Sequence, residues 1–119
     1  MELLLIAVIV IAGWFIYKKV GPGKGVTTIT SEEAKRKFGD RNVQFIDVRT
    51  PGEYKGQKVK QFKNMPLNEL SKRTKELDPN KEVVVICQSG MRSSKACGEL
   101  KRQGFTSVSN VRGGMNMWK

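Results

Sequence analysis

The strongest constraint on the fold is an uninterrupted apolar run, Val83-Val84-Val85-Ile86. A strand with one face in water alternates apolar and polar residues, whereas a strand covered on both faces is apolar throughout. The run therefore predicts a central strand of a parallel sheet with helices on both faces. Cys87 follows directly, so we expect it at the carboxyl end of that strand, where open α/β sheets bind their ligands.

The segments around this run alternate between strand and helix patterns. Further short strands are expected at residues 27–29, 43–48, 63–65 and 108–111. Longer helices are expected from a Thr30–Glu33 capping box through residue 38, from 66 through 77, and from the Cys87 loop to Gly104. Shorter helical turns are expected after residue 50 and at 115–118. This order predicts the α/β class with a mostly parallel sheet.

The N-terminus is a separate, strongly apolar segment, because residues 3–17 carry no charge and Lys18 and Lys19 follow them. As a helix these residues would be about 22 Å long, which is short for a hydrocarbon core of ~30 Å, but the lysines can snorkel outward. A signal peptide would need a basic start, and a core helix would need a polar face. We therefore expect a membrane anchor at 1–19, a Gly/Pro-rich linker at 20–26 and one folded domain at 27–119.

The distribution of charge predicts the orientation of the chain in a membrane and the kind of partner it binds. All 22 Lys and Arg lie after residue 17, so the positive-inside rule predicts a single-pass protein with its domain in the cytoplasm. The net charge of +11 favours an anionic lipid surface as a partner, or simply solubility. The basic residues are scattered and no nucleic-acid-binding motif accompanies them, so we expect no nucleic-acid partner.

The chain contains no histidine and only two cysteines, Cys87 and Cys97. The absence of histidine excludes Ser–His and Cys–His mechanisms. Two cysteines do not form a disulfide scaffold, and without histidine they argue against a structural zinc site. We therefore expect no metal and no cofactor, and a reactive cysteine must be activated in another way.

The loop after the central strand offers such a route. The segment Cys87-Gln88-Ser89-Gly90-Met91-Arg92-Ser93 leads from the strand into a helix, whose first amides and positive dipole end favour a thiolate. Gly90 permits the backbone amides to converge, Arg92 adds positive charge, and Ser89 and Ser93 add hydroxyl donors. We predict Cys87 as the catalytic nucleophile and residues 88–93 as the substrate-binding cradle. The anion bound there is either a persulfide or a phosphate ester.

Three motifs together resemble the rhodanese family. The first is the Cys87–Ser93 loop, the second is Ile46-Asp47-Val48-Arg49-Thr50-Pro51-Gly52-Glu53-Tyr54, and the third is Gly113-Gly114-Met115-Asn116-Met117-Trp118. They occur in the family's order and extend the resemblance over residues 27–118. It implies a doubly wound fold with about five parallel strands. It also implies sulfur transfer from thiosulfate or a persulfide donor, through a persulfide on Cys87, to cyanide or a thiol.

The resemblance also ranks the alternatives. Four residues separate Cys87 from Arg92, a length that resembles sulfurtransferases, whereas phosphatase relatives of this fold carry one residue more. Two positions depart from the family pattern: Gln88 stands where a basic residue is common, and residues 56–62 replace a Gly-His-Ile-Pro-Gly-Ala stretch. A persulfide carrier or binding module at the membrane, without turnover, is therefore the second hypothesis. A phosphatase or arsenate reductase is the third.

Other residues of these motifs are expected to be structural. Cys97 shares a helix face with Leu100 and is predicted to lie in the core rather than to act as a resolving thiol. Asp47 and Arg49 are predicted to form a structural ion pair. We interpret residues 113–114 as a turn, and residues 117–118 as packing residues.

Overall fold

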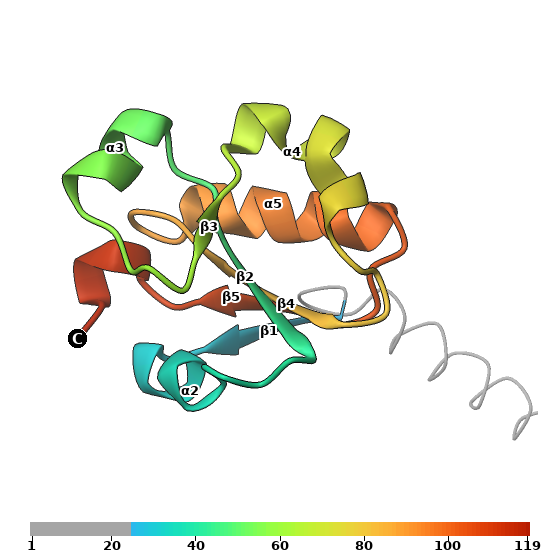
Figure 1. The fold of residues 1–119 in the computed structure, drawn as a ribbon, viewed down its shortest axis with the longest axis horizontal. Helices are drawn as coiled ribbons and strands as arrows, with labels where there is room; N and C mark the ends of the chain where they lie inside the picture. The colour runs from blue at the N-terminus through green and yellow to red at the C-terminus, as the bar shows by residue number, and fades with distance from the viewer. Residues whose placement is uncertain (1–24) are drawn as a thin grey trace, which may run out of the picture.

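The computed structural model describes residues 25–119. Five parallel strands form one sheet in the order β1-β5-β4-β2-β3 (Figure 1). Their bounds are β1 Val26–Ile29, β2 Val43–Asp47, β3 Lys63–Asn64, β4 Glu82–Ile86 and β5 Val108–Val111. The predicted parallel five-stranded sheet is therefore confirmed, and β4 is its middle strand.

The apolar run of β4 contributes to two cores, one on each face of the sheet. Val83, Val85 and Cys87 belong to one cluster, and Val84 and Ile86 belong to the other. The side chains of residues 83–87 are fully buried. Because successive side chains of a strand point to opposite faces, an unbroken apolar run is what a doubly covered strand requires.

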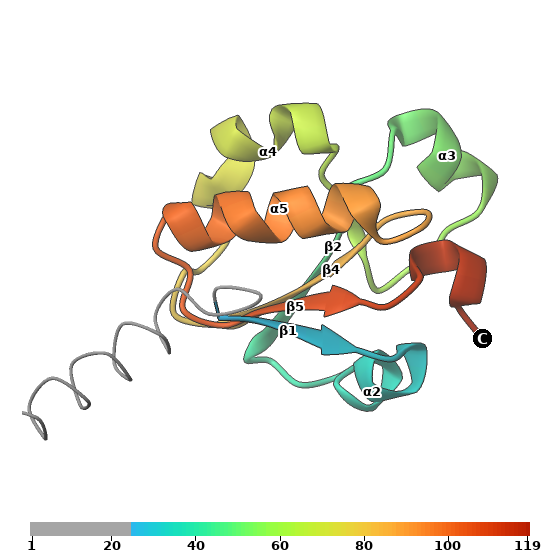
Figure 2. The same cartoon turned by 180° about the vertical axis from the view of Figure 1, so that it is seen from behind.

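Helices cover both faces of the sheet (Figures 1 and 2). On one face lie α3, α4 and α5, and on the other lies α2. The C-terminal η2 lies at the end of the sheet, and its Met115 shares a buried cluster with Ala34 of α2. The bounds are α2 Ser31–Arg36, α3 Pro51–Gly56, α4 Leu67–Arg73, η1 Thr74–Glu76, α5 Met91–Arg102 and η2 Gly114–Met117. Rings of Phe38, Phe45, Phe62 and Trp118 lie edge-on or tilted to one another in the α2 core.

Two helices begin with capping boxes. The Thr30 hydroxyl accepts from the Glu33 amide, while the Glu33 carboxylate accepts from the Thr30 amide, as predicted. Thr50 and Glu53 form the same arrangement at the start of α3, with Pro51 in the first helical position. The second box places Glu53 at the edge of the Cys87 loop, where it has a further role.

Three details of the prediction are wrong. Helix α2 ends at Arg36 rather than at Phe38. Helix α4 ends at Arg73, the chain tightens into η1, and Leu77 is extended, although it still packs against the core. Met117 is 57% exposed and is not a packing residue, because the short η2 turn directs it outward.

The predicted anchor at residues 1–19 and most of the linker at 20–26 lie outside the described residues. Within residues 25–119, no helix is both long enough and apolar enough to cross a membrane. The first described strand begins at Val26, one residue before the predicted start of the domain.

Candidate functional site

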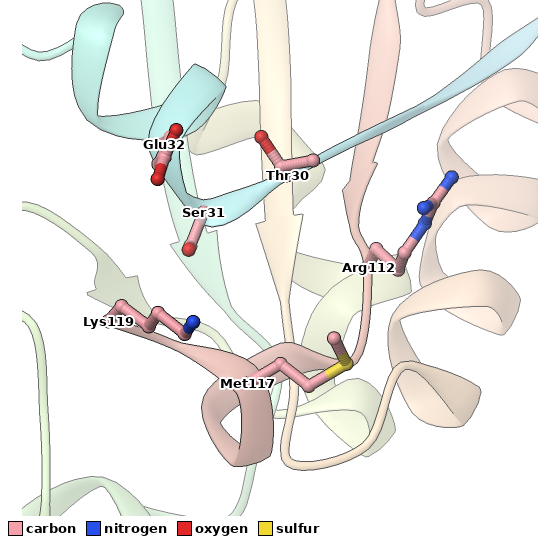
Figure 3. Close-up of a pocket in the computed structure, with 6 residues that line it drawn as sticks. All are labelled: Thr30, Ser31, Glu32, Arg112, Met117 and Lys119. Atoms are coloured by element: carbon pink, nitrogen blue, oxygen red, sulfur yellow. The ribbon is translucent and has the colours of Figure 1, made fainter.

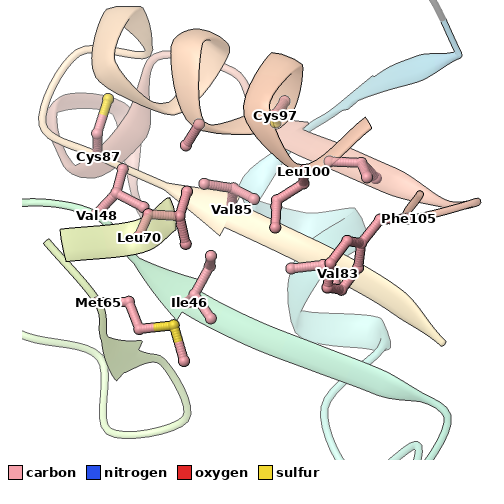
Figure 4. Close-up of a cluster of buried hydrophobic side chains, with 12 residues drawn as sticks. Ile46, Val48, Met65, Leu70, Val83, Val85, Cys87, Cys97, Leu100 and Phe105 are labelled. Carbon is pink, nitrogen blue, oxygen red and sulfur yellow. The ribbon is translucent and has the colours of Figure 1, made fainter. Parts of the chain in front are cut away.

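Cys87 lies at the carboxyl end of the central strand, directly before the loop that leads into α5 (Figure 4). Its side chain is fully buried, and its sulfur is directed toward the loop and the first turn of that helix. The sequence prediction of a cysteine at a strand end, beneath a helix N-terminus, is therefore confirmed in its geometry.

The loop encloses the sulfur with hydrogen-bonding groups. The Gly90 amide donates to Cys87 Sγ at 2.9 Å, and Ser93 Oγ lies 3.2 Å from the sulfur. Gly90 has a φ of 103°, in the left-handed region that glycine adopts without strain. This conformation turns its amide toward the sulfur, as the sequence pattern predicted.

These contacts change the acidity of the thiol. Burial raises the pKa of Cys87, but hydrogen bonds from the Ser93 hydroxyl and from the Ser93, Gly90 and Ser89 amides outweigh it. The net result is a pKa below that of an ordinary cysteine. The loop therefore favours a thiolate without any imidazole.

Arg92 is committed to an ion pair. Its guanidinium meets the Glu53 carboxylate in a bidentate arrangement, with N–O distances of 2.6 Å and 2.9 Å. The pair lowers the pKa of Glu53 to about 2, with help from the Thr50 amide. The positive charge expected beside the sulfur is thus largely compensated, and Arg92 serves to join the first turn of α5 to α3.

Gln88 is also held by protein groups. Its Nε2 donates to Asn116 Oδ1 at 2.7 Å, and its Oε1 accepts from Arg49 Nη1 at 3.3 Å. Ser89 and Met91 are exposed, with Met91 at 77%. Of the predicted cradle side chains, Ser93 alone hydrogen-bonds to the sulfur.

The loop backbone is held from the other side by η2. The amides of Met115 and Asn116 donate to the carbonyls of Cys87 and Gln88, at 2.8 Å and 3.0 Å. Gly114 touches the Cys87 carbonyl so closely that a Cβ on it would overlap the oxygen. The Gly113–Gly114 turn is therefore a requirement of the reactive loop.

Arg49 and Asp47 form the predicted structural ion pair, which is wholly buried. Arg49 Nη2 lies 2.8 Å from Asp47 Oδ2, and each side chain is 1% exposed. Arg49 also donates to the carbonyls of Glu53 and Gln57. Arg49 therefore joins the end of β2 to the middle and the C-terminal end of α3 and, through Gln88, to the Cys87 loop.

Cys97 is a core residue, as predicted. It is buried against the sheet on α5 (Figure 4), and burial raises its pKa to about 12, with a smaller contribution from Cys87. Both cysteines are free thiols. The two thiols therefore differ in acidity, since the pKa of Cys87 lies below that of an ordinary cysteine and the pKa of Cys97 lies above it.

Three side chains around the site were not predicted from the sequence, namely Glu53, Asn110 and Asn116. Glu53 had a local signal, since Thr50 and Glu53 have the spacing of a capping box. Asn110 had none, because it lies on a strand far along the chain from the loop, and Asn116 lies in the 113–118 motif, for which only a turn and packing residues were expected.

Two surface hollows lie near this end of the sheet. One, of about 370 Å³, is lined by Val48, Thr50, Pro66, Leu67, Asn68 and Arg92, and thus borders the Arg92 ion pair. The other, of about 270 Å³, is lined by Thr30, Ser31, Glu32, Arg112, Met117 and Lys119 (Figure 3). Cys87 lines neither hollow, in keeping with its burial.

The fold and the loop define a class of protein: a parallel α/β domain with a buried cysteine between its central strand and a helix N-terminus. The chain belongs to the rhodanese-like domain family, whose model matches residues 30–119.

The chain is also similar to individual proteins. The chain is 36% identical over 95 residues to the putative sulfurtransferase YtwF of Bacillus subtilis, covering 79% of this chain and 91% of the relative. It is 34% identical over 117 residues to the uncharacterized protein YqhL of the same organism, covering 96% and 91%. A rhodanese-like domain protein from Staphylococcus aureus superposes with a TM-score of 0.71 at 30% identity, covering 78% and 91%.

Proposed function

We propose that this chain is a sulfurtransferase that carries sulfane sulfur as a persulfide on Cys87. Membership of the rhodanese family supports a sulfur-transfer role. The observation that carries the proposal is the buried Cys87 thiol, whose pKa is lowered by the Ser93 hydroxyl and loop amides against the effect of burial. That arrangement supplies a nucleophile in a chain that contains no histidine.

The proposed reaction has two displacement steps. The Cys87 thiolate attacks the outer sulfur of thiosulfate, or of a persulfide donor, and a new S–S bond forms. The donor's own S–S bond breaks, and sulfite, or the donor thiolate, leaves with the electron pair. A thiol or cyanide then attacks the outer sulfur of the persulfide, and Cys87 leaves as the thiolate that began the cycle.

The loop suits each of these charged states. We expect the amides that favour the thiolate to stabilise a persulfide anion on the same residue, so that one cradle serves both. The Glu53 and Asp47 carboxylates are each paired with an arginine. Their charges are therefore compensated, and they do not leave an unpaired anion beside the sulfur.

The test is thiocyanate formation from thiosulfate and cyanide by the full chain. We expect Cys87→Ser to fall to the uncatalysed rate and Cys97→Ala to keep the activity. Mass spectrometry should find one added sulfur atom on Cys87 after incubation with the donor alone. Absence of both the added sulfur and the turnover would contradict the proposal.

A persulfide carrier without efficient turnover is the second candidate. It is favoured by the side chain of Gln88, which is bonded to Asn116 and Arg49 and offers no cation to a dianionic donor. It predicts a Cys87 persulfide with negligible thiocyanate formation. Hydrolysis of an aryl phosphate faster than sulfur transfer would instead indicate a phosphatase.

We also propose that residues 1–19 anchor the protein to a membrane with its domain in the cytoplasm. The uncharged stretch at 3–17, with Lys18 and Lys19 after it, supports this. Ile9→Arg is expected to move the full chain from the membrane to the supernatant fraction, since arginine at a helix centre costs about 3 kcal/mol on insertion. The matched Ile9→Leu variant should stay with the membrane. Equal fractionation of the two variants would contradict the anchor.

A further inference from the structure

A chain of hydrogen bonds leads away from the reactive sulfur and ends on the reactive loop itself. Ser93 Oγ lies 3.2 Å from Cys87 Sγ, and it lies 2.5 Å from Asn110 Oδ1 on β5. Asn110 Nδ2 donates to Ser94 Oγ at 3.0 Å, and Ser94 Oγ donates to the Gly90 carbonyl at 2.9 Å. Asn110 therefore lies between two hydroxyls of the first turn of α5.

The direction of this chain follows from counting protons. Ser93 has one hydroxyl proton and three acceptors within reach: Asn110 Oδ1, the Gly90 carbonyl and the Cys87 sulfur. The Gly90 carbonyl already accepts from both the amide and the hydroxyl of Ser94, which occupy its two lone pairs. The Ser93 hydroxyl proton is therefore donated either to Asn110 Oδ1 or to Cys87 Sγ.

The hydrogen bond to Ser94 determines whether Asn110 directs its side-chain oxygen or its nitrogen toward Ser93. Because the Ser94 hydroxyl proton is committed to Gly90, its oxygen is left to accept, and the amide nitrogen of Asn110 faces it. The carbonyl oxygen of Asn110 then faces Ser93 and accepts its proton. In this arrangement Ser93 accepts from the Cys87 thiol instead of donating to it.

We propose that Asn110 is a positioning residue that competes with Cys87 for the Ser93 hydroxyl proton and so opposes ionisation of the sulfur. When the thiol ionises, Ser93 turns its proton to the sulfur, and the Asn110 carbonyl loses its donor. That loss opposes ionisation, whereas the Ser93 hydroxyl bond favours it. The inference concerns the site of the proposed sulfur transfer, but it needs only the Cys87 thiol and no turnover.

Other charges around the sulfur stay constant in this process. On α5, Arg92 is paired with Glu53 of α3, and Cys97 remains a thiol because burial raises its pKa to about 12. At the end of β2, Asp47 is paired with Arg49. Of these groups, none contacts Asn110 through a hydrogen bond or an ion pair. A change at Asn110 is therefore expected to act on Cys87 through Ser93.

The test is the pKa of Cys87, measured on the full chain from the pH dependence of its alkylation by iodoacetamide and of thiolate absorbance, with Cys87→Ser as the blank. Asn110→Ala frees the Ser93 proton for the sulfur and should lower the pKa of Cys87 by about 0.5–1, the size of one net hydrogen bond. Ser93→Ala removes the donor and should raise it. Asn110→Asp keeps an acceptor on Ser93, adds negative charge and should also raise it.

Opposite shifts for Asn110→Ala and Ser93→Ala distinguish this role from a merely structural one, which would move both in one direction. A pKa in Asn110→Ala equal to or above that of the wild type would overturn the proposal, whether or not the protein transfers sulfur.

Discussion

At residue 114, even a methyl group would collide with the reactive loop. Gly114 has a φ of 56°, and a Cβ on it would overlap the Cys87 carbonyl oxygen. Gly39 also has a positive φ, of 88°, which would strain any other residue, but nothing lies within 4 Å of a Cβ there. Comparing alanine variants at the two positions therefore separates the cost of a positive φ from the cost of steric overlap with the loop.

We predict that Gly39→Ala costs about 1 kcal/mol of unfolding free energy, from the positive φ alone. Gly114→Ala should cost about 1–3 kcal/mol more, because the added atom forces the loop or η2 to move. It should also slow the alkylation of Cys87, whereas Gly39→Ala should not. Denaturant unfolding and iodoacetamide kinetics check both, and equal losses in the two variants would show that the loop tolerates the atom.

The residues of the site that could be predicted from sequence are those that follow one another in the chain. Cys87, Gly90 and Ser93 belong to one strand–loop–helix segment, so local geometry alone brings the amide and hydroxyl to the sulfur. Glu53 and Asn110 reach the same loop from other elements. Their roles depend on how those elements pack, which spacing along the chain does not reveal.

At the level of elements, one ion pair joins α3 to α5 beside the reactive loop. The Glu53 carboxylate caps its own helix and also holds Arg92. Its pKa in the folded protein is about 2, against an ordinary value of 4.5. A lowered carboxyl pKa adds stability that is complete above the unfolded value and is lost as the pH falls through the folded one.

We therefore predict that the wild type loses stability between pH 4.5 and about 2 more steeply than Glu53→Gln does. Because a third of each side chain is exposed, solvent screening limits the difference to about 1 kcal/mol. Denaturant unfolding across this pH range measures it. Glu32→Gln, which removes an exposed pair with Arg36, is the matched control and should follow the wild type closely. Parallel curves for Glu53→Gln and the wild type would contradict the prediction.

Element boundaries show where sequence patterns stop being informative. The Thr30–Glu33 box predicted the start of α2 because capping is local. The end of α4 was not predicted, because Leu77 satisfies the helical spacing while lying in extended chain. A leucine contributes to the core from either conformation, so apolar spacing alone does not locate a helix end.

At the level of the whole molecule, Arg49 connects more segments than any residue of the loop. It binds Asp47 at the end of β2, the carbonyls of Glu53 within α3 and of Gln57 just after it, and Gln88 beside the cysteine. Its side chain is 1% exposed, so it is buried with a full charge. Such a pair is costly to break from one side, because the remaining partner stays charged and buried.

We predict that Arg49→Met destabilises the protein by about 3–5 kcal/mol, measured by denaturant unfolding. The double variant Asp47→Asn, Arg49→Met should recover part of this loss, since it leaves no unpaired buried charge. Arg49→Lys keeps the charge but cannot keep all the hydrogen bonds to carbonyls. Its unfolding free energy should lie between those of Arg49→Met and the double variant. A loss below about 1 kcal/mol in Arg49→Met would contradict this account of the pair.

The overall fold was predictable because it rests on one property of β4, its unbroken apolar run, together with the alternation of elements on either side. The order of the strands was not predicted. In the structure it follows from the pairing of β4 with β2 on one side and β5 on the other.

The burial of the second cysteine has a consequence for how long a loaded site would last. Because burial raises its pKa to about 12, Cys97 is a poor internal nucleophile, and we expect it not to discharge the proposed Cys87 persulfide by disulfide formation. A persulfide on Cys87 would thus persist until an acceptor molecule from solution reaches it. Its lifetime would depend on the concentration and shape of that acceptor rather than on a reaction within the domain.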